Sequence, residues 1–93
     1  MENLNNYKVI ESTKGISEED KKTIIEAIEK FVFMEENVQK KVMRRELKEL
    51  LNCEITIEIC AEGSDNKEIE KKAKEGEFCH ICAEGKHYYI MKQ

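Results

Sequence analysis

Residues 53–60 read Cys-Glu-Ile-Thr-Ile-Glu-Ile-Cys, and this alternation of apolar and polar side chains predicts a half-buried β-strand. The end of the strand, Ile-Cys-Ala-Glu-Gly at residues 59–63, recurs unchanged at residues 81–85. The repeat predicts a second strand over residues 77–83 that ends at an equivalent position. Its two cysteines, Cys60 and Cys82, would then occupy matching places in one sheet.

The segment between the two strands predicts a short helix. Ser64-Asp65-Asn66 with Glu68 has the pattern of an N-cap and capping box, and Gly76 follows as a terminator. A strand–helix–strand order predicts a crossover connection and parallel pairing of the two strands. Aligning the repeat then places Cys60 directly beside Cys82 in the sheet.

Glu84-Gly85 predicts a tight turn into a last strand over residues 86–92. If the turn has two residues, one sheet face gathers polar and thiol side chains, namely Glu58, Cys60, His80, Cys82, His87 and Tyr89. A loop one residue longer would turn the last strand over and remove His87 from that face.

The first half of the chain predicts a short strand at residues 7–10 followed by two helices. Ser17 precedes three acidic residues, as a helix N-cap does, and apolar residues then recur at helical spacing to Val32. The pattern blurs at residues 35–37 and resumes over residues 38–51, which predicts a break between the helices.

Together these elements predict an α+β fold in a single domain, residues 1–93. The predicted order is strand–helix–helix–strand–helix–strand–strand, with a small mixed sheet of three to four strands and the helices packed on one face. The periodicity of each element also predicts five buried positions, which are Ile28, Phe31, Leu47, Ile57 and Ile81.

Composition limits the classes of function. The chain has 93 residues, of which 40% are hydrophobic, and a net charge of -4, which disfavours general binding to nucleic-acid backbones. No apolar run is long enough for a membrane span and the N-terminus does not resemble an export signal, so we expect a cytoplasmic protein. The abundance of Lys, Glu, Ile and Asn, without Pro or Trp, suggests an AT-rich bacterial or phage gene.

The four cysteines are expected to be reduced in that compartment, as free thiols, metal ligands or redox groups. Structural zinc is one hypothesis, with Cys60, Cys82 and His87 as ligands and either His80 or Glu58 as the fourth. The run Cys79-His80-Ile81-Cys82 followed by Ala-Glu-Gly resembles half of a zinc knuckle, although alternation in a strand would bury Cys79. No other cofactor is expected, and plain thiols are the simpler interpretation.

A thiol-dependent enzyme is the least favoured hypothesis. The Cys-X-X-Cys motif lies inside a predicted strand, whereas redox motifs usually begin a helix that lowers the thiol pKa. No oxyanion donor or orienting third group is identifiable beside the cysteines and histidines.

Residues 38–51 form the one basic segment of the chain. A ridge of positive side chains lies at helical spacing, consisting of Lys40, Lys41, Arg44, Arg45 and Lys48. Such a ridge can contact an anion or nucleic acid, or it can be a solvated face whose charges pair with nearby acids. The acidity of the rest of the chain favours the second interpretation.

The sequence therefore favours a small acidic binding protein that acts as a non-catalytic regulator or inhibitor. Its expected partner is a nucleic-acid-handling protein with a basic surface, by analogy of size and charge with the small inhibitors of phages and mobile elements. The alternative is a zinc-stabilised nucleic-acid-binding module that uses the basic helix 38–51. Binding to naked nucleic acid is disfavoured, and membrane association is not expected.

Overall fold

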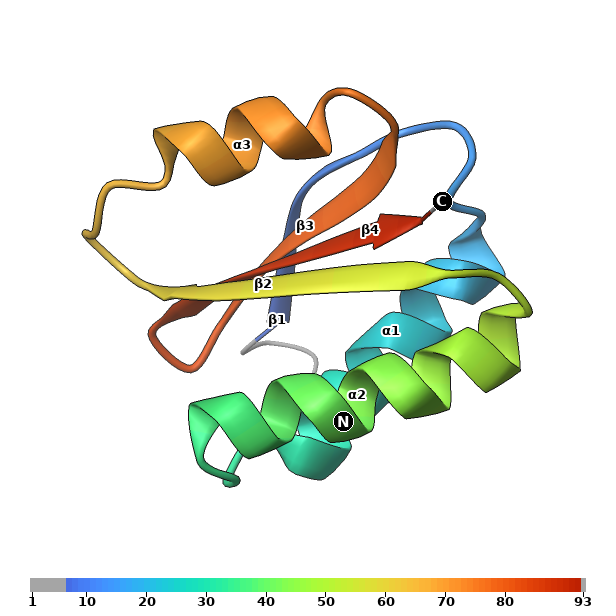
Figure 1. Ribbon diagram of the computed structural model, residues 1–93, viewed down its shortest axis with the longest axis horizontal. Helices are drawn as coiled ribbons and strands as arrows, with labels where there is room; N and C mark the ends of the chain where they lie inside the picture. The colour runs from blue at the N-terminus through green and yellow to red at the C-terminus, as the bar shows by residue number, and fades with distance from the viewer. Residues whose placement is uncertain (1–6, 93) are drawn as a thin grey trace.

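Four strands form one antiparallel sheet in the computed structural model, which describes residues 7–92 (Figure 1). The elements follow the predicted order, and the α+β class is confirmed. Their bounds are β1 Tyr7–Ser12, α1 Glu18–Phe31, α2 Glu36–Leu51, β2 Ile55–Ala61, α3 Lys67–Ala73, β3 Glu77–Ala83 and β4 Lys86–Lys92.

The strand order β1-β3-β4-β2 places β4 between the two strands that carry the repeat. The expected mixed sheet, in which β2 and β3 pair directly, is therefore wrong. A hairpin brings β4 beside β3 with a far smaller loss of chain entropy than a crossover requires, so β4 takes the edge of β3 that faces β2. The strands β2 and β3 still run parallel to each other, since each pairs antiparallel with β4.

The turn between β3 and β4 fixes which side chains share a face. Ala83 pairs with Lys86, so the loop has two residues. Of the two loop lengths considered from the sequence, the shorter one is therefore present. Both of them, Glu84 and Gly85, have positive φ angles of 51° and 76°. This is the geometry of a type I′ hairpin turn, whose twist matches that of the flanking strands.

Helices cover both faces of the sheet, with α1 and α2 on one side and α3 on the other (Figure 1). The prediction that all helices pack on one face is wrong for α3. The reason is that Phe78, Tyr89 and Met91 give the second face an apolar patch, which packs with Ala73 and Ile69 of α3. Burying this patch removes apolar surface from water, which favours a helix above it.

The helix boundaries agree with the sequence signals for α1 and α2. The Ser17 Oγ accepts from the Asp20 amide at 3.0 Å, and the Asp20 carboxylate accepts from the Ser17 amide at 3.2 Å, which completes a capping box. A break between the two helices is present, as predicted, but it covers residues 32–35 and not 35–37, since α2 already begins at Glu36.

The predicted capping box of α3 is wrong. The Ser64 hydroxyl instead donates to the Ala61 carbonyl at 2.7 Å, and Asn66 at the N-cap makes no capping hydrogen bond with its side chain. The Asp65 carboxylate accepts from the Lys67 amide at 3.1 Å, so a local turn replaces the expected cap.

The main core lies between the sheet and the pair α1 and α2. Of the five expected core residues, Ile28, Leu47, Ile57 and Ile81 are buried, whereas Phe31 is only partly buried. Phe31 is the last residue of α1, at the margin of the core, and the Lys30 ammonium lies 5.4 Å from its ring centroid. The polar residue Gln39, which the sequence does not predict to be buried, also lies in this core. Its Nε2 donates to the Tyr88 hydroxyl at 2.9 Å.

The first prediction concerns this packing. Ile57→Ala should lower the free energy of unfolding by about 2–5 kcal/mol, because it leaves a cavity opposite α2. Urea denaturation measures the change, with Val9→Ala on the exposed edge strand β1 as the control for a residue of similar size. A loss below about 0.5 kcal/mol for Ile57→Ala would mean that the two sheet faces are assigned backwards.

Candidate functional site

The sheet face beneath α3 carries the thiol and imidazole groups that the sequence placed together. The β4 residue His87 pairs with Cys60 of β2 on one side and with Cys82 of β3 on the other. In the next row on the same face, Tyr89 lies between Glu58 and His80. The predicted membership of this face is therefore confirmed.

Direct contact between Cys60 and Cys82 was expected and is wrong, because β4 stands between them. Neighbouring strands lie about 4.8 Å apart, so the two Cα atoms are separated by about 10 Å. A disulfide needs Cα atoms within about 7 Å of each other, and all four cysteines are free. His87 is the side chain that both thiols share as a neighbour.

His80 is held in a closed network beneath α3. It is 4% exposed, its Nε2 lies 2.8 Å from the Nδ1 of His87, and its ring stacks on Tyr89 with centroids 4.1 Å apart. The Tyr89 hydroxyl in turn accepts from the Asn66 side-chain amide at 2.5 Å. The network ties the loop before α3 to the centre of the sheet.

The thiols with resolved pKa shifts are less acidic than a free cysteine. Burial raises the pKa of Cys79 to about 11, and burial also raises the pKa of Cys60, partly offset by a hydrogen bond with Ser64. Catalytic cysteines need a lowered pKa, because the thiolate is the nucleophile. These two thiols therefore lack the activation that a thiol-dependent enzyme requires.

Cys79 and Cys82 point to opposite faces of β3, and Cys79 is buried in the core beneath α1 and α2. The two cysteines of the Cys-X-X-Cys motif thus do not face one site, unlike those of a zinc knuckle. Among residues 7–92, no group of three or more His, Cys, Asp or Glu side chains is arranged to hold a metal ion. Structural zinc stays a prediction, which metal analysis of protein purified without chelator can decide.

The second prediction concerns the pH dependence of stability. Burial, and then the neighbouring His87, lower the pKa of His80, while Glu70 of α3 and Glu11 of β1 act in the opposite direction. The folded protein thus favours the neutral form of His80. The contribution of this residue to the free energy of unfolding should therefore be fully present above its unfolded pKa of 6.5. This contribution should decrease as the pH drops below that value, because the unfolded chain binds the proton more tightly than the folded protein does.

Urea denaturation between about pH 7.5 and about pH 5.5 measures this loss, with His80→Phe as the variant that keeps an aromatic ring against Tyr89. We expect the pH dependence over that interval to become shallower in the variant. An unchanged slope would show that His80 is not the titrating group.

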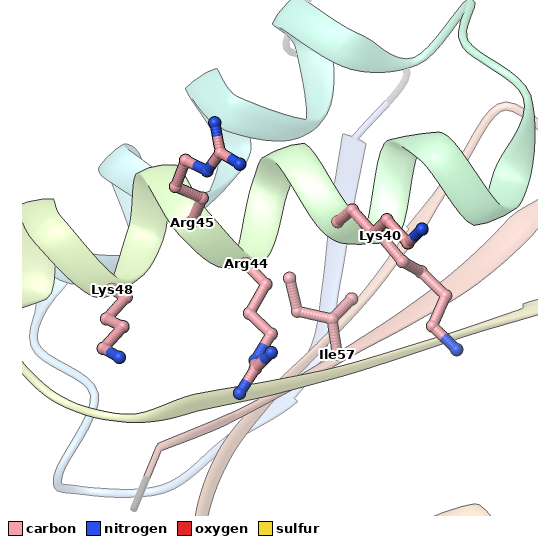
Figure 2. Close-up of a pocket in the computed structure, with 6 residues that line it drawn as sticks. Lys40, Arg44, Arg45, Lys48 and Ile57 are labelled. Atoms are coloured by element: carbon pink, nitrogen blue, oxygen red, sulfur yellow. The ribbon is translucent and has the colours of Figure 1, made fainter.

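The basic ridge of α2 lies along the edge strand β2, and Figure 2 shows Arg44 and Lys48 extending toward that strand. The Arg44 Nε donates to the Ile55 carbonyl at 3.1 Å. Three of the ridge cations also form ion pairs with two glutamates, namely Lys40 with Glu58 at 3.4 Å, and Arg44 and Lys48 with Glu54 at 3.9 and 2.9 Å. Much of the ridge therefore pairs with nearby acids.

The same ridge lines a hollow of about 540 Å³, which we call the α2–β2 groove. Its lining residues are Lys40, Lys41, Arg44, Arg45, Lys48 and Ile57. All five predicted binding residues are thus brought together around one surface feature. A hydrogen bond with Lys48, and then the charges of Lys48 and Arg44, lower the pKa of Glu54 at its border.

The connection between α1 and α2 exposes apolar side chains that sequence reasoning did not single out. Phe33 is 94% exposed, Val38 46% and Met34 40%, while Glu35 and Glu36 are also exposed between them. We call these five residues the α1–α2 corner. The run Phe31-Val32-Phe33-Met34 was the available signal, because a helix end cannot bury four consecutive side chains.

Comparisons of the chain with protein-family models, curated proteins and solved structures gave no match. None of the helices in residues 7–92 is long and apolar enough to cross a membrane. A function for this chain therefore has to be inferred from the chemistry of the α2–β2 groove, the α1–α2 corner and the network around His80.

Proposed function

We propose that this protein is a non-catalytic regulator or inhibitor that docks on a basic surface of a nucleic-acid-handling protein. The α1–α2 corner makes the central contact in this proposal. The observation that carries it is the 94% exposure of Phe33, a large aromatic side chain. Phe33 belongs to the connection between α1 and α2, which lies on the side of the molecule away from α3 (Figure 1).

An exposed aromatic side chain can supply a large share of the binding free energy when a partner buries it. Aromatic and Met side chains are enriched at the centres of protein interfaces, where a few anchors supply most of the binding energy. Phe33 and Met34 are adjacent, and Val38 extends the apolar surface into the first turn of α2. In the corner, Phe33 can thus insert into an apolar pocket of the partner, and Met34 and Val38 can make flanking contacts.

Charge supports a basic partner. Residues 31–39 contain Glu35 and Glu36 and no Lys or Arg, and the whole chain has a net charge of -4. Opposite charge speeds association and selects among partners more than it raises affinity. Proteins that handle nucleic acids display basic surfaces because phosphate contacts supply much of their affinity. A bound acidic domain would block such a surface.

The sheet face beneath α3 supports a non-catalytic role. His80 is buried and engaged with His87 and Tyr89, and burial raises the pKa of Cys60. These groups are used for packing and hydrogen bonding within the fold, which leaves recognition by surface residues as the activity that the chemistry supports.

The third prediction tests the docking site by photo-crosslinking. A photoreactive phenylalanine analogue placed at Phe33 should form an adduct with a basic nucleic-acid-binding protein in an extract of the source organism. The matched control carries the analogue at Leu50, which is 60% exposed in the last turn of α2. The adduct should be absent from the control and should weaken in Glu35→Lys/Glu36→Lys, because charge reversal opposes a basic surface.

The purified partner then provides the functional measurement. The protein should displace nucleic acid from it, and Phe33→Ala should weaken this displacement about tenfold or more, as loss of a central anchor does. Leu50→Ala should leave it unchanged. Identical adducts at both positions, an acidic partner, or full displacement by Phe33→Ala would each contradict the proposal.

A further inference from the structure

The α2–β2 groove shares no lining residue with the α1–α2 corner and has a different chemistry. Five of its six lining residues are positively charged, and they include both arginines of the chain. No acidic side chain lines it, although the protein as a whole is acidic. A volume of about 540 Å³ is within the usual size of pockets for small ligands.

The groove keeps a surplus of positive charge after its ion pairs are counted. Glu58 offsets Lys40, and the single carboxylate of Glu54 is shared by Arg44 and Lys48. Lys41 and Arg45 form no ion pair with any other residue in the range 7–92. Exposed pairs of this kind contribute about 0–1 kcal/mol, so an incoming anion can replace the glutamates at little cost.

The length of the anion decides whether it is attracted. At physiological salt, charges are screened over about 8 Å, so a compact anion inside the groove responds mainly to the five cations. A long nucleic-acid backbone would extend beyond them over the acidic remainder of the surface, where it is repelled. The groove also has no aromatic lining residue on which a base could stack.

We propose that the α2–β2 groove binds a compact oligophosphate, such as the phosphate chain of a nucleoside triphosphate or inorganic triphosphate. Arg44 presents its guanidinium from a position fixed by the Ile55 carbonyl. Lys41 and Arg45 supply the charges that have no acidic partner within residues 7–92. Arginine and lysine are the usual partners of phosphate oxygens in proteins.

Calorimetric titration with inorganic triphosphate at about 150 mM salt tests the site. We expect saturable binding with a dissociation constant below about 1 mM that weakens as salt increases. Lys41→Gln/Arg45→Gln should weaken binding about tenfold or more, through the loss of two charge-assisted contacts. The matched control is Lys71→Gln/Lys72→Gln on α3, which removes two exposed charges from the opposite face and should change affinity less than about twofold.

Two further titrations identify the source of the phosphate. Equal affinity for ATP and inorganic triphosphate would assign recognition to the phosphate chain alone, and tighter binding of ATP would assign it to a nucleotide. Binding that is absent up to about 10 mM ligand, or unchanged in Lys41→Gln/Arg45→Gln, would overturn the proposal. Tighter binding of duplex DNA than of triphosphate at the same salt would also overturn it. Phe33→Ala should not affect any of these titrations, because the corner does not line the groove.

Discussion

The fold depends on the pairing of β4 with two strands at once. The type I′ turn at Glu84-Gly85 forms the hairpin with β3, and the free side of β4 then receives β2. Every residue of β4 has a partner on both sides, from Lys86 between Ala61 and Ala83 to Lys92 between Ile55 and Glu77. This double pairing determines which side chains face α1 and α2 and which face α3.

The same pairing explains how the pentapeptide repeat is used. The two copies end strands that run in the same direction, and β4 holds them in matching register on either side of His87. The thiols and imidazoles consequently lie in rows across the sheet. Burial raises the pKa of Cys60 and lowers the pKa of His80, so it favours the neutral forms of these two groups. The repeat thus builds a structural network, and the two surfaces that we propose for binding lie elsewhere on the molecule.

The basic residues of α2 divide into two sets with different partners. Lys40, Arg44 and Lys48 reach toward β2, which is the last strand of the sheet order formed by residues 7–92, and Arg44 donates to the Ile55 carbonyl there. Charged side chains along an edge strand oppose pairing with another chain, which is a common protection of such edges. Lys41 and Arg45 have no such role, since neither forms an ion pair within residues 7–92.

The sequence predicted the elements well because local patterns control them. Alternation located β2, the pentapeptide repeat located β3, and Ser17 marked the start of α1. The face on which His87 lies followed once the turn was known to have two residues. Strand order could not be derived in this way, since it depends on loop entropy and on non-local pairing. The side on which α3 packs, the pairing of Glu54 and Glu58 with α2, and the exposure of Phe33 depend likewise on contacts between distant segments.

A nuclear Overhauser experiment on isotopically labelled protein tests the central claim, which is that β4 separates the two strands of the repeat. We predict contacts between backbone protons of Tyr88 and both Ile59 and Ile81, and none between backbone protons of β2 and β3. Protons on paired strands lie close enough to be detected, whereas those two strands apart, at about 10 Å, do not. Direct backbone contacts between Ile59 and Ile81 would contradict the account.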